Sequence, residues 1–264
     1  MPHGQTWFHF LPFFHGAEHA AQGLGPTWLA HGSIHLQHVF AALLVLILLT
    51  ALGISTYRKV ATVSDAMVPE ARLTPAVFME LIVQAVYGMM SDMMGSKAAR
   101  FFLPLIGTCA LFILFSNALG LIPGFVPATD TLNTTFACAL IIFISTHVFG
   151  VKEHGLAYFK HFFGPIIKWY ALPLMLIMFV IETISHIVRP LSLSVRLMGN
   201  MFVDHTLLTV MIGLIVGLFG VVGVFIPIPL FVMVLGSLVV VVQTVVFCLL
   251  STVYIALAIQ HEEH

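Results

Sequence analysis

Long apolar runs separated by short polar segments dominate this chain, and they predict helices that cross a membrane. A crossing needs roughly 17 to 25 mainly apolar residues, because a bilayer offers no water to satisfy exposed backbone groups. Runs of that length or longer occupy residues 38–57, 101–123, 135–151, 170–219 and 230–259. The pattern therefore predicts an all-α polytopic membrane protein with about five transmembrane helices.

Two further segments border these runs. Residues 75–95 interleave Glu80, Gln84 and Asp92 with apolar side chains, which favours an amphipathic helix lying along the membrane interface. Residues 220–229 contain clustered glycine and proline, which interrupt helices. We therefore expect a break there, between the last two long helices.

Composition and charge support one integral membrane domain over residues 1–264, with 1–36 as an N-terminal segment outside the membrane. The chain is 60% hydrophobic and only 8% charged, whereas soluble domains carry about 25% charged residues. The formal net charge of −1 gives no electrostatic basis for binding nucleic acid. The three cysteines lie in apolar runs, so no disulfide framework is expected.

Basic residues predict the orientation. They fall in segments that this layout places on one side of the membrane: Arg58, Lys59, Arg72, Lys97, Arg100, Lys152, Lys160 and Lys168. The segments on the opposite side carry no Lys or Arg. Because basic residues concentrate in cytoplasmic loops, the N-terminus is predicted outside and the C-terminus inside.

Within the run 170–219, polar and ionisable side chains recur on one face of the predicted helix. At ~100° per residue they lie within roughly 40° of Glu182 around the helix axis, over a length of ~33 Å. This polar stripe comprises Glu182, His186, Arg189, Arg196, Asn200 and Asp204. A charged group at mid-membrane costs about 2.5 to 3.5 kcal/mol even on lenient scales. The polar stripe therefore predicts an ion path, or a surface that meets a charged partner inside the membrane.

Arg196 is the sharpest signal in the polar stripe. Its guanidinium stays protonated, so it cannot shuttle protons, but it can attract a passing carboxylate and repel cations. The alternative is an internal ion pair with Glu182 or Asp204. These residues lie about four turns before and two turns after Arg196 on the same helix, which is too far for direct contact.

Neighbouring polar groups extend the candidate site. Glu182 and Asp204 flank Arg196, where each could relay protons, line a wet cavity or cap the helix. Asn200 and Ser192 lie one turn from Arg196, where they could hydrogen-bond its guanidinium or bridge helices.

Three polar side chains on other faces complete the set. Gln243 is a buried amide inside the last helix and needs a partner, for which the polar stripe is the candidate. His205 faces away from Arg196, where it could relay protons or pack in the interior. His147, in the third span, is interpreted as a packing residue.

The N-terminal segment is rich in histidine. The pairs His15/His19 and His31/His35 have a spacing that could bind a metal on a helix. No cysteine or clustered acid accompanies them, so we predict a solvated segment without metal or cofactor.

The segment RPLSLSVRLMGNMF closely resembles the signature of subunit a of F-type ATP synthases. That family has a Pro-x-Ser-x-x-x-Arg-Leu-x-Gly-Asn core, matched here by Pro190, Ser192, Arg196, Leu197, Gly199 and Asn200. The resemblance covers most of the chain and includes Asn117, Asp130, Gln243 and Tyr254.

This resemblance implies a proton-channel and stator subunit of the Fo sector, with no catalytic site of its own but required by a rotary ATP synthase. The helices of 170–259 are implied to face a c-subunit ring as a tilted pair. Two offset half-channels protonate and deprotonate the ring carboxylates. Arg196 is implied to be the essential ring-facing cation, Glu182 the inner half-channel acid, and Asn200 and Gln243 groups on the outer route.

The same resemblance implies partners and a location. The partners are the c-subunit ring, the b-subunit peripheral stalk, the F1 sector indirectly and the lipid bilayer, with no nucleic acid. A bacterial inner membrane is predicted, with the mitochondrial inner membrane as the alternative. H⁺ and Na⁺ both remain open as the coupling ion, because the ring supplies the ion-binding carboxylate.

The outer route departs from the family's usual patterns. Many bacterial members have glutamate at the position of His205 and histidine at that of Gly236, and mitochondrial members usually exchange them. This chain has His205 but no partner at Gly236. Asp204, next to His205, is the alternative partner.

Two other functions compete with this interpretation. A self-contained secondary transporter would have its own substrate cavity and often two related halves, but the sequence shows no internal repeat. A structural scaffold would tolerate exchange of Arg196 for Leu or Ala with little loss of ion flux.

Overall fold

The computed structural model describes residues 7–10, 14–16, 36–60, 74–122, 124–155, 158, 172–219 and 228–259. Most of the predicted N-terminal segment, most of the loop before residue 75 and most of the predicted break at 220–229 lie outside these ranges. The described residues form helices and short connections, without any strand.

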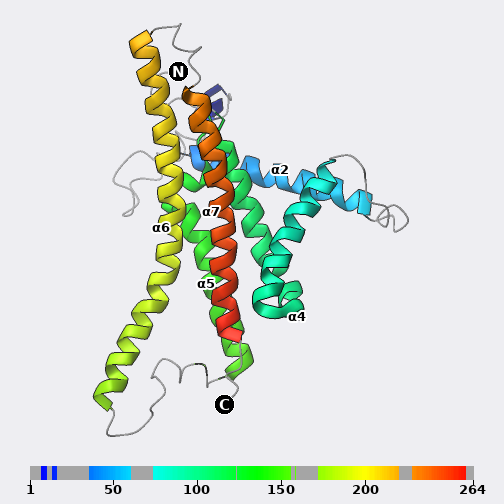
Figure 1. Cartoon of the computed structure of the whole chain (residues 1–264), viewed down its shortest axis with the longest axis vertical. Helices are drawn as coiled ribbons and strands as arrows, with labels where there is room; N and C mark the ends of the chain where they lie inside the picture. Colours follow the sequence, from blue (N-terminus) through cyan, green and yellow to red (C-terminus); the bar gives the residue numbers. More distant parts are fainter. Residues whose placement is uncertain are drawn as a thin grey trace.

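The described residues include five long helices (Figure 1): α2 (Gln37–Val60), α4 (Pro75–Gly120), α5 (Leu132–His154), α6 (Leu172–Phe219) and α7 (Ile228–Ile259). Two short 3-10 helices, η1 (Trp7–Phe10) and η2 (Ala128–Asp130), accompany them. By length and composition, all five long helices can cross a membrane. The predicted all-α polytopic fold is confirmed.

α4 contains both the predicted amphipathic segment and the predicted second span. Thr74 caps its first turn, with the side-chain hydroxyl accepting from the Val77 N–H. Gly95 has φ 80° and ψ 158°, a region that is essentially restricted to glycine. The chain reverses near this point, so the two halves of α4 form a hairpin (Figure 1). The sequence predicted the two segments, but not that the second would begin directly after Gly95.

A shared core joins α4, α5, α6 and α7. Its fully buried members include Ile113 of α4, Ile142 of α5, Leu197 of α6 and Phe247 of α7. α4 also packs closely on α6, since a Cβ on Gly120 would lie 2.6 Å from Met201 Cε and 2.9 Å from the Pro127 ring. These contacts hold the middle of α6 against the rest of the chain.

The long helices run in two main directions. α6 and α7 pack side by side along the long axis of the molecule, while α2 lies across them (Figure 1). α6 is bent along its length. Pro190 lies inside α6 and lacks the N–H for a helical hydrogen bond, which explains a bend in this helix.

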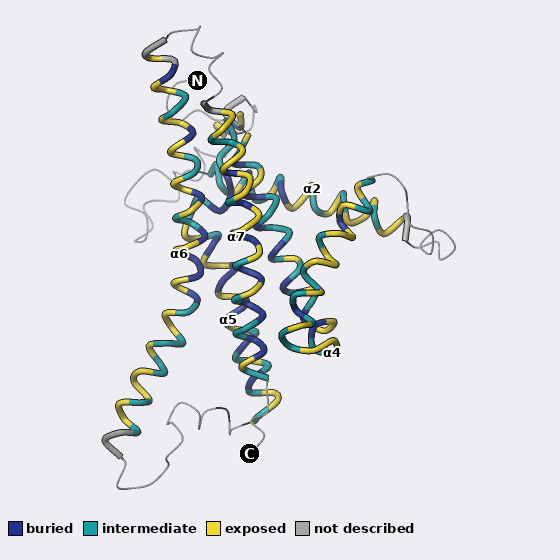
Figure 2. Tube along the Cα trace, in the orientation of Figure 1, coloured by how far each residue is buried: buried dark blue, intermediate teal, exposed yellow. Residues whose placement is uncertain are grey.

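Much of the apolar surface has no cover within the described chain. Exposed residues run along the whole of α6 and most of α2 (Figure 2). Large side chains such as Leu176, Phe202 and Leu230 are more than half exposed. Such a surface is expected where helices meet lipid or another membrane subunit.

Candidate functional site

The polar stripe follows the border between two faces of α6. The packed face contains Leu193, Leu197, Met201 and Leu208, whose spacing places them on one side of the helix. The stripe lies beside this packed face rather than within it. Its members therefore divide between those turned toward α5 and α7 and those turned away from them.

Arg196 belongs to the outward group and is exposed. Its neighbours Val195 and Val203 on that side are also exposed, at 45% and 57%. Among the described residues, Arg196 has no hydrogen bond or ion pair, so the alternative of an internal pair with Glu182 or Asp204 is not observed. The structure thus presents a permanent cation on an apolar surface.

Asn200 and Gln243 connect the polar stripe to α7. The Asn200 Nδ2 donates to Gln243 Oε1 over 2.7 Å, across 43 residues of sequence. Gln243 is 3% exposed, and its Nε2 has no partner in the described part of the chain. The predicted contact between Gln243 and the stripe is confirmed.

Of the two roles left open for Asn200 and Ser192, the described structure shows a bridge between helices for Asn200 and no hydrogen bond from either residue to the guanidinium. Asn200 bonds to Gln243 instead, and Ser192 is an exposed side chain with no bond to Arg196 in the described structure. Both residues still lie within one turn of Arg196 on α6.

An inner cluster lies at the N-terminal end of the polar stripe. Glu182 Oε1 is 3.3 Å from His186 Nε2, one turn along α6. The His186 ring lies 5.2 Å from the His147 ring of α5, between centroids. The Arg189 guanidinium carbon lies 5.4 Å from the centre of the Tyr254 ring of α7. The stripe thus continues into groups on two other helices.

A small cavity opens at this inner cluster. Both histidines, Arg189 and Tyr254 line about 20 Å³ of space between α5, α6 and α7. This volume holds a water molecule but no organic substrate. Sequence reasoning treated His147 as a packing residue; the one available signal was that it is an ionisable side chain inside a span.

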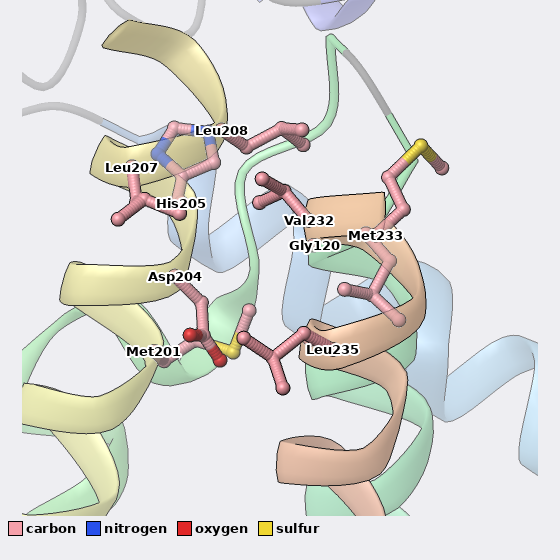
Figure 3. Close-up of a pocket in the computed structure, with 11 residues that line it drawn as sticks. Gly120, Met201, Asp204, His205, Leu207, Leu208, Val232, Met233 and Leu235 are labelled. Carbon is pink, nitrogen blue, oxygen red and sulfur yellow. The ribbon is translucent and has the colours of Figure 1, made fainter. Parts of the chain in front are cut away.

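An outer pocket lies at the other end of the polar stripe (Figure 3). Asp204 and His205 line it together with Gly236 of α7, around about 20 Å³ of space. The Asp204 carboxylate points toward Met201 and Leu235 (Figure 3). Its Oδ2 is buried without a hydrogen-bond partner among the described residues.

Gly236 has a packing reason in this pocket. A Cβ at this position would lie 2.8 Å from Leu121 Cδ2, so α7 passes close to the end of α4. Glycine at this position therefore leaves room for the Leu121 side chain between α7 and the end of α4.

The connection after α4 adds an acid near the outer pocket. Thr129 donates a hydrogen bond to Asn117 Oδ1, and both side chains are buried. Burial raises the pKa of Asp130 above its ordinary value, while the nearby charges of His205 and His38 oppose that rise. Asp130 therefore lies within electrostatic reach of groups on α6 and α2.

Of the histidine pairs near the N-terminus that were considered as metal ligands, His19, His31 and His35 lie outside the described residues. Among the residues that the structure describes, no group of three His, Cys, Asp or Glu side chains could hold a metal ion.

Comparison with known proteins gives one consistent result. The family model described as ATP synthase A chain matches residues 38–256. A protein named ATP synthase subunit a from Sorangium cellulosum is 40% identical over 252 residues, covering 94% of this chain and 93% of that protein. A subunit a of Geobacter sulfurreducens is 47% identical over 178 residues, covering 67% of this chain and 71% of its own length.

Proposed function

The chain belongs to the ATP synthase A chain family, and we propose that it is the proton-channel and stator subunit of the Fo sector. In this function it protonates and deprotonates carboxylates on a rotating c-subunit ring. Ion flow is thereby coupled to rotation and to ATP synthesis. This function requires no catalytic site in the chain itself.

The observation that carries this proposal is the exposed Arg196 on the apolar surface of α6. An unpaired cation facing hydrocarbon is unfavourable, so this surface requires an anion from another polypeptide. A ring carboxylate supplies that anion each time a c subunit passes. The guanidinium favours the ionised carboxylate and repels cations that would leak past it.

Two access routes lie on either side of Arg196 along α6. The inner route begins at Glu182, 14 residues before Arg196, or ~21 Å along the helix. The outer route uses Asp204 and His205, about two turns beyond Arg196, and Asn200 with Gln243 lies between this route and the cation. Ser192 borders Arg196 on the inner side. The offset between the routes means that a proton can cross only by riding on the ring.

Helix lengths support a strong tilt for the ring-facing pair. α6 has 48 residues and is therefore ~72 Å long, more than twice the ~30 Å bilayer core. α2 has 24 residues, ~36 Å, which suits an upright crossing. A helix as long as α6 fits within the bilayer only where it is inclined or bent. The polar stripe then runs largely within the membrane, and Arg196 stays near mid-depth.

The arrangement of the ends supports the proposed orientation. The α4 reversal near Gly95 and the C-terminal ends of α5 and α7 lie at one end of the bundle (Figure 1). Lys97, Arg100 and Lys152 belong to these segments. We assign this end to the cytoplasm of a bacterium and the N-terminus to the outside. The first half of α4, over 75–95, is proposed to lie along the interface.

The assembly completes the function. The c-subunit ring contacts the Arg196 face of α6, and the b-subunit peripheral stalk anchors the chain against the torque of the ring. The F1 sector is reached only indirectly. The two pockets that the polar stripe lines each hold about 20 Å³, whereas the larger space of about 710 Å³ between α4 and α7 is lined mainly by apolar side chains.

Substitution of Arg196 tests this proposal. In the intact synthase reconstituted into vesicles, we expect Arg196→Ala to abolish ATP synthesis driven by a proton gradient, because the ring carboxylate loses its counter-charge. Co-purification of the c ring and the ATPase head controls for assembly. Wild-type coupling in an assembled Arg196→Ala synthase would remove Arg196 from the mechanism.

A further inference from the structure

The inner cluster holds two imidazoles to which the proposed function gives no role. His186 Nε2 lies 3.3 Å from Glu182 Oε1. The ring of His147 lies 5.2 Å from that of His186 and is inclined to it by 71°. Three titratable groups from α5 and α6 therefore follow one another in space, beginning with the acid of the proposed inner route.

His147 is held in a defined orientation. Its Nδ1 lies 2.9 Å from the carbonyl oxygen of Phe143. Since a carbonyl oxygen can only accept, Nδ1 carries the hydrogen, and Nε2 of the neutral ring keeps a lone pair for an incoming proton. The Tyr158 ring, 5.9 Å away between centroids, packs edge-on against the imidazole.

A water-sized space connects the two imidazoles. Both rings line the cavity of about 20 Å³ that also includes Pro190 and Leu193. A cavity of this size holds one water molecule where polar partners are present. It lies about halfway between Glu182 and Arg196, because the adjoining Arg189 is seven residues from each. The cavity therefore extends the inner route toward Arg196.

The charged and titratable surroundings of His186 come from every element packed against it. α6 contributes Glu182 and Arg189, and α5 contributes His147. α7 contributes Tyr254, whose ring lies beside Arg189, and Tyr158 follows α5. Along α6, His186 thus lies between a carboxylate one turn before it and a permanent cation three residues after it.

We infer that His186 and His147 carry protons from Glu182 to the cavity on the way to Arg196, which rests on the proposed function. The Glu182 carboxyl gives its proton to Nε2 of His186, so an O–H bond breaks and an N–H bond forms. His186 then releases its Nδ1 proton to water in the cavity or to Nε2 of His147. Each imidazole returns to its neutral form after the proton has passed on.

The test uses intact synthase in vesicles with the ATPase head facing the buffer, so that buffer pH sets the pH of the inner side. The variants are His186→Gln and His147→Gln, which keep polarity but cannot carry a proton. His154→Gln, near the end of α5 and outside the cavity lining, is the matched control. ATP-driven proton uptake into the vesicles is measured at buffer pH values from 5 to 8. Each rate is divided by the rate of ATP hydrolysis that the same vesicles show after an uncoupler is added.

A positioned proton carrier contributes about 10²- to 10⁴-fold to a rate. Because water in the cavity replaces part of that contribution, we expect His186→Gln and His147→Gln each to lower proton uptake roughly 5- to 20-fold. In both variants, the rate of proton uptake also no longer varies with buffer pH in the range where imidazole titrates. His154→Gln keeps the wild-type rate and profile. The dependence on the pH inside the vesicle is unchanged in all three variants.

Other outcomes would overturn the inference. These are a wild-type rate and profile in both variants, or a uniform loss at every buffer pH, which marks a packing role. If only one histidine variant assembles with the ATPase head, the inference is judged on the proton uptake of that variant. If neither variant assembles, the imidazoles have a structural role and the inference is overturned. Arg196→Ala separates the two proposals: an uncoupled Arg196→Ala beside normal histidine variants rejects only the imidazole route.

Discussion

At the scale of single residues, the position of a side chain around α6 decides what it can do. Arg196 lies on the side that no described part of the chain covers, whereas Asp204 reaches toward α7 from the same helix (Figure 3). A helical projection of the sequence placed both in one polar stripe but did not divide them. The division depends on which face of α6 packs against α5 and α7. The positions of those two helices determine that face, and the sequence of α6 alone does not.

Some residue contacts were accessible from sequence and others were not. Gln243 is a lone amide in an apolar helix, and a buried amide needs a hydrogen-bond partner. The sequence therefore predicted a polar partner, and the structure shows that it is Asn200. The pairing of His147 with His186 could not be predicted from the sequence. Many buried histidines have hydrogen-bond partners without taking part in function, and the sequence does not determine how α5 aligns with α6. The nearness of Asp130 to His205 likewise depends on the path of the connection after α4.

The Asn200–Gln243 contact makes a prediction at this scale. Gln243→Leu removes the acceptor of the Asn200 amide, and hydrogen bonds between membrane helices contribute about 0.6 to 1.7 kcal/mol. We expect proton-driven ATP synthesis to fall about 3- to 20-fold, a smaller loss than in Arg196→Ala. The measurement is the synthesis rate of reconstituted synthase at a fixed gradient.

Asn200→Leu and the double variant complete a cycle for this contact. If the two side chains act as a pair, the double variant is no slower than the more affected single variant. An unchanged rate in Gln243→Leu would show that this amide only packs, and strictly additive losses would show that the hydrogen bond has no role in transport.

At the scale of elements, the bounds of α6 and α7 followed from the apolar runs, because length and hydrophobicity dominate helix formation in a membrane. The sequence predicted the hairpin in α4 only in part. The amphipathic pattern of 75–95 separated the two segments, but the reversal depends on the backbone conformation of one residue, Gly95. Composition alone does not reveal a positive φ at one particular glycine.

Gly95→Ala tests the origin of this reversal. Alanine at φ 80° and ψ 158° enters a region that costs about 1 to 3 kcal/mol. We expect the midpoint of thermal disassembly of the purified synthase to fall. Gly88→Ala is the matched control in the same helix, since a Cβ there meets nothing within 4 Å, and alanine favours the helix. Equal midpoints for the two variants would show that Gly95 does not determine the turn.

At the scale of the whole molecule, the described residues leave one side of α6 uncovered. Arg196 shares α6 with many exposed apolar side chains, and Figure 2 shows exposed positions along the length of this helix. The sequence indicated a charged partner within the membrane but not which side of the bundle would face it. α5 and α7 pack against α6, and the side of α6 that carries Arg196 is left exposed by the described residues.

Cross-linking in the intact synthase tests this central claim most directly. Val203 lies on the Arg196 side of α6 and is 57% exposed, whereas Ile144 on α5 is 50% exposed. With a cysteine placed one turn from the ring carboxylate, we expect Val203→Cys to form a disulfide with a c subunit under mild oxidation, and Ile144→Cys to form none. A c-subunit product from Ile144→Cys but not from Val203→Cys would contradict the account, because the ring would then face a different side of the molecule.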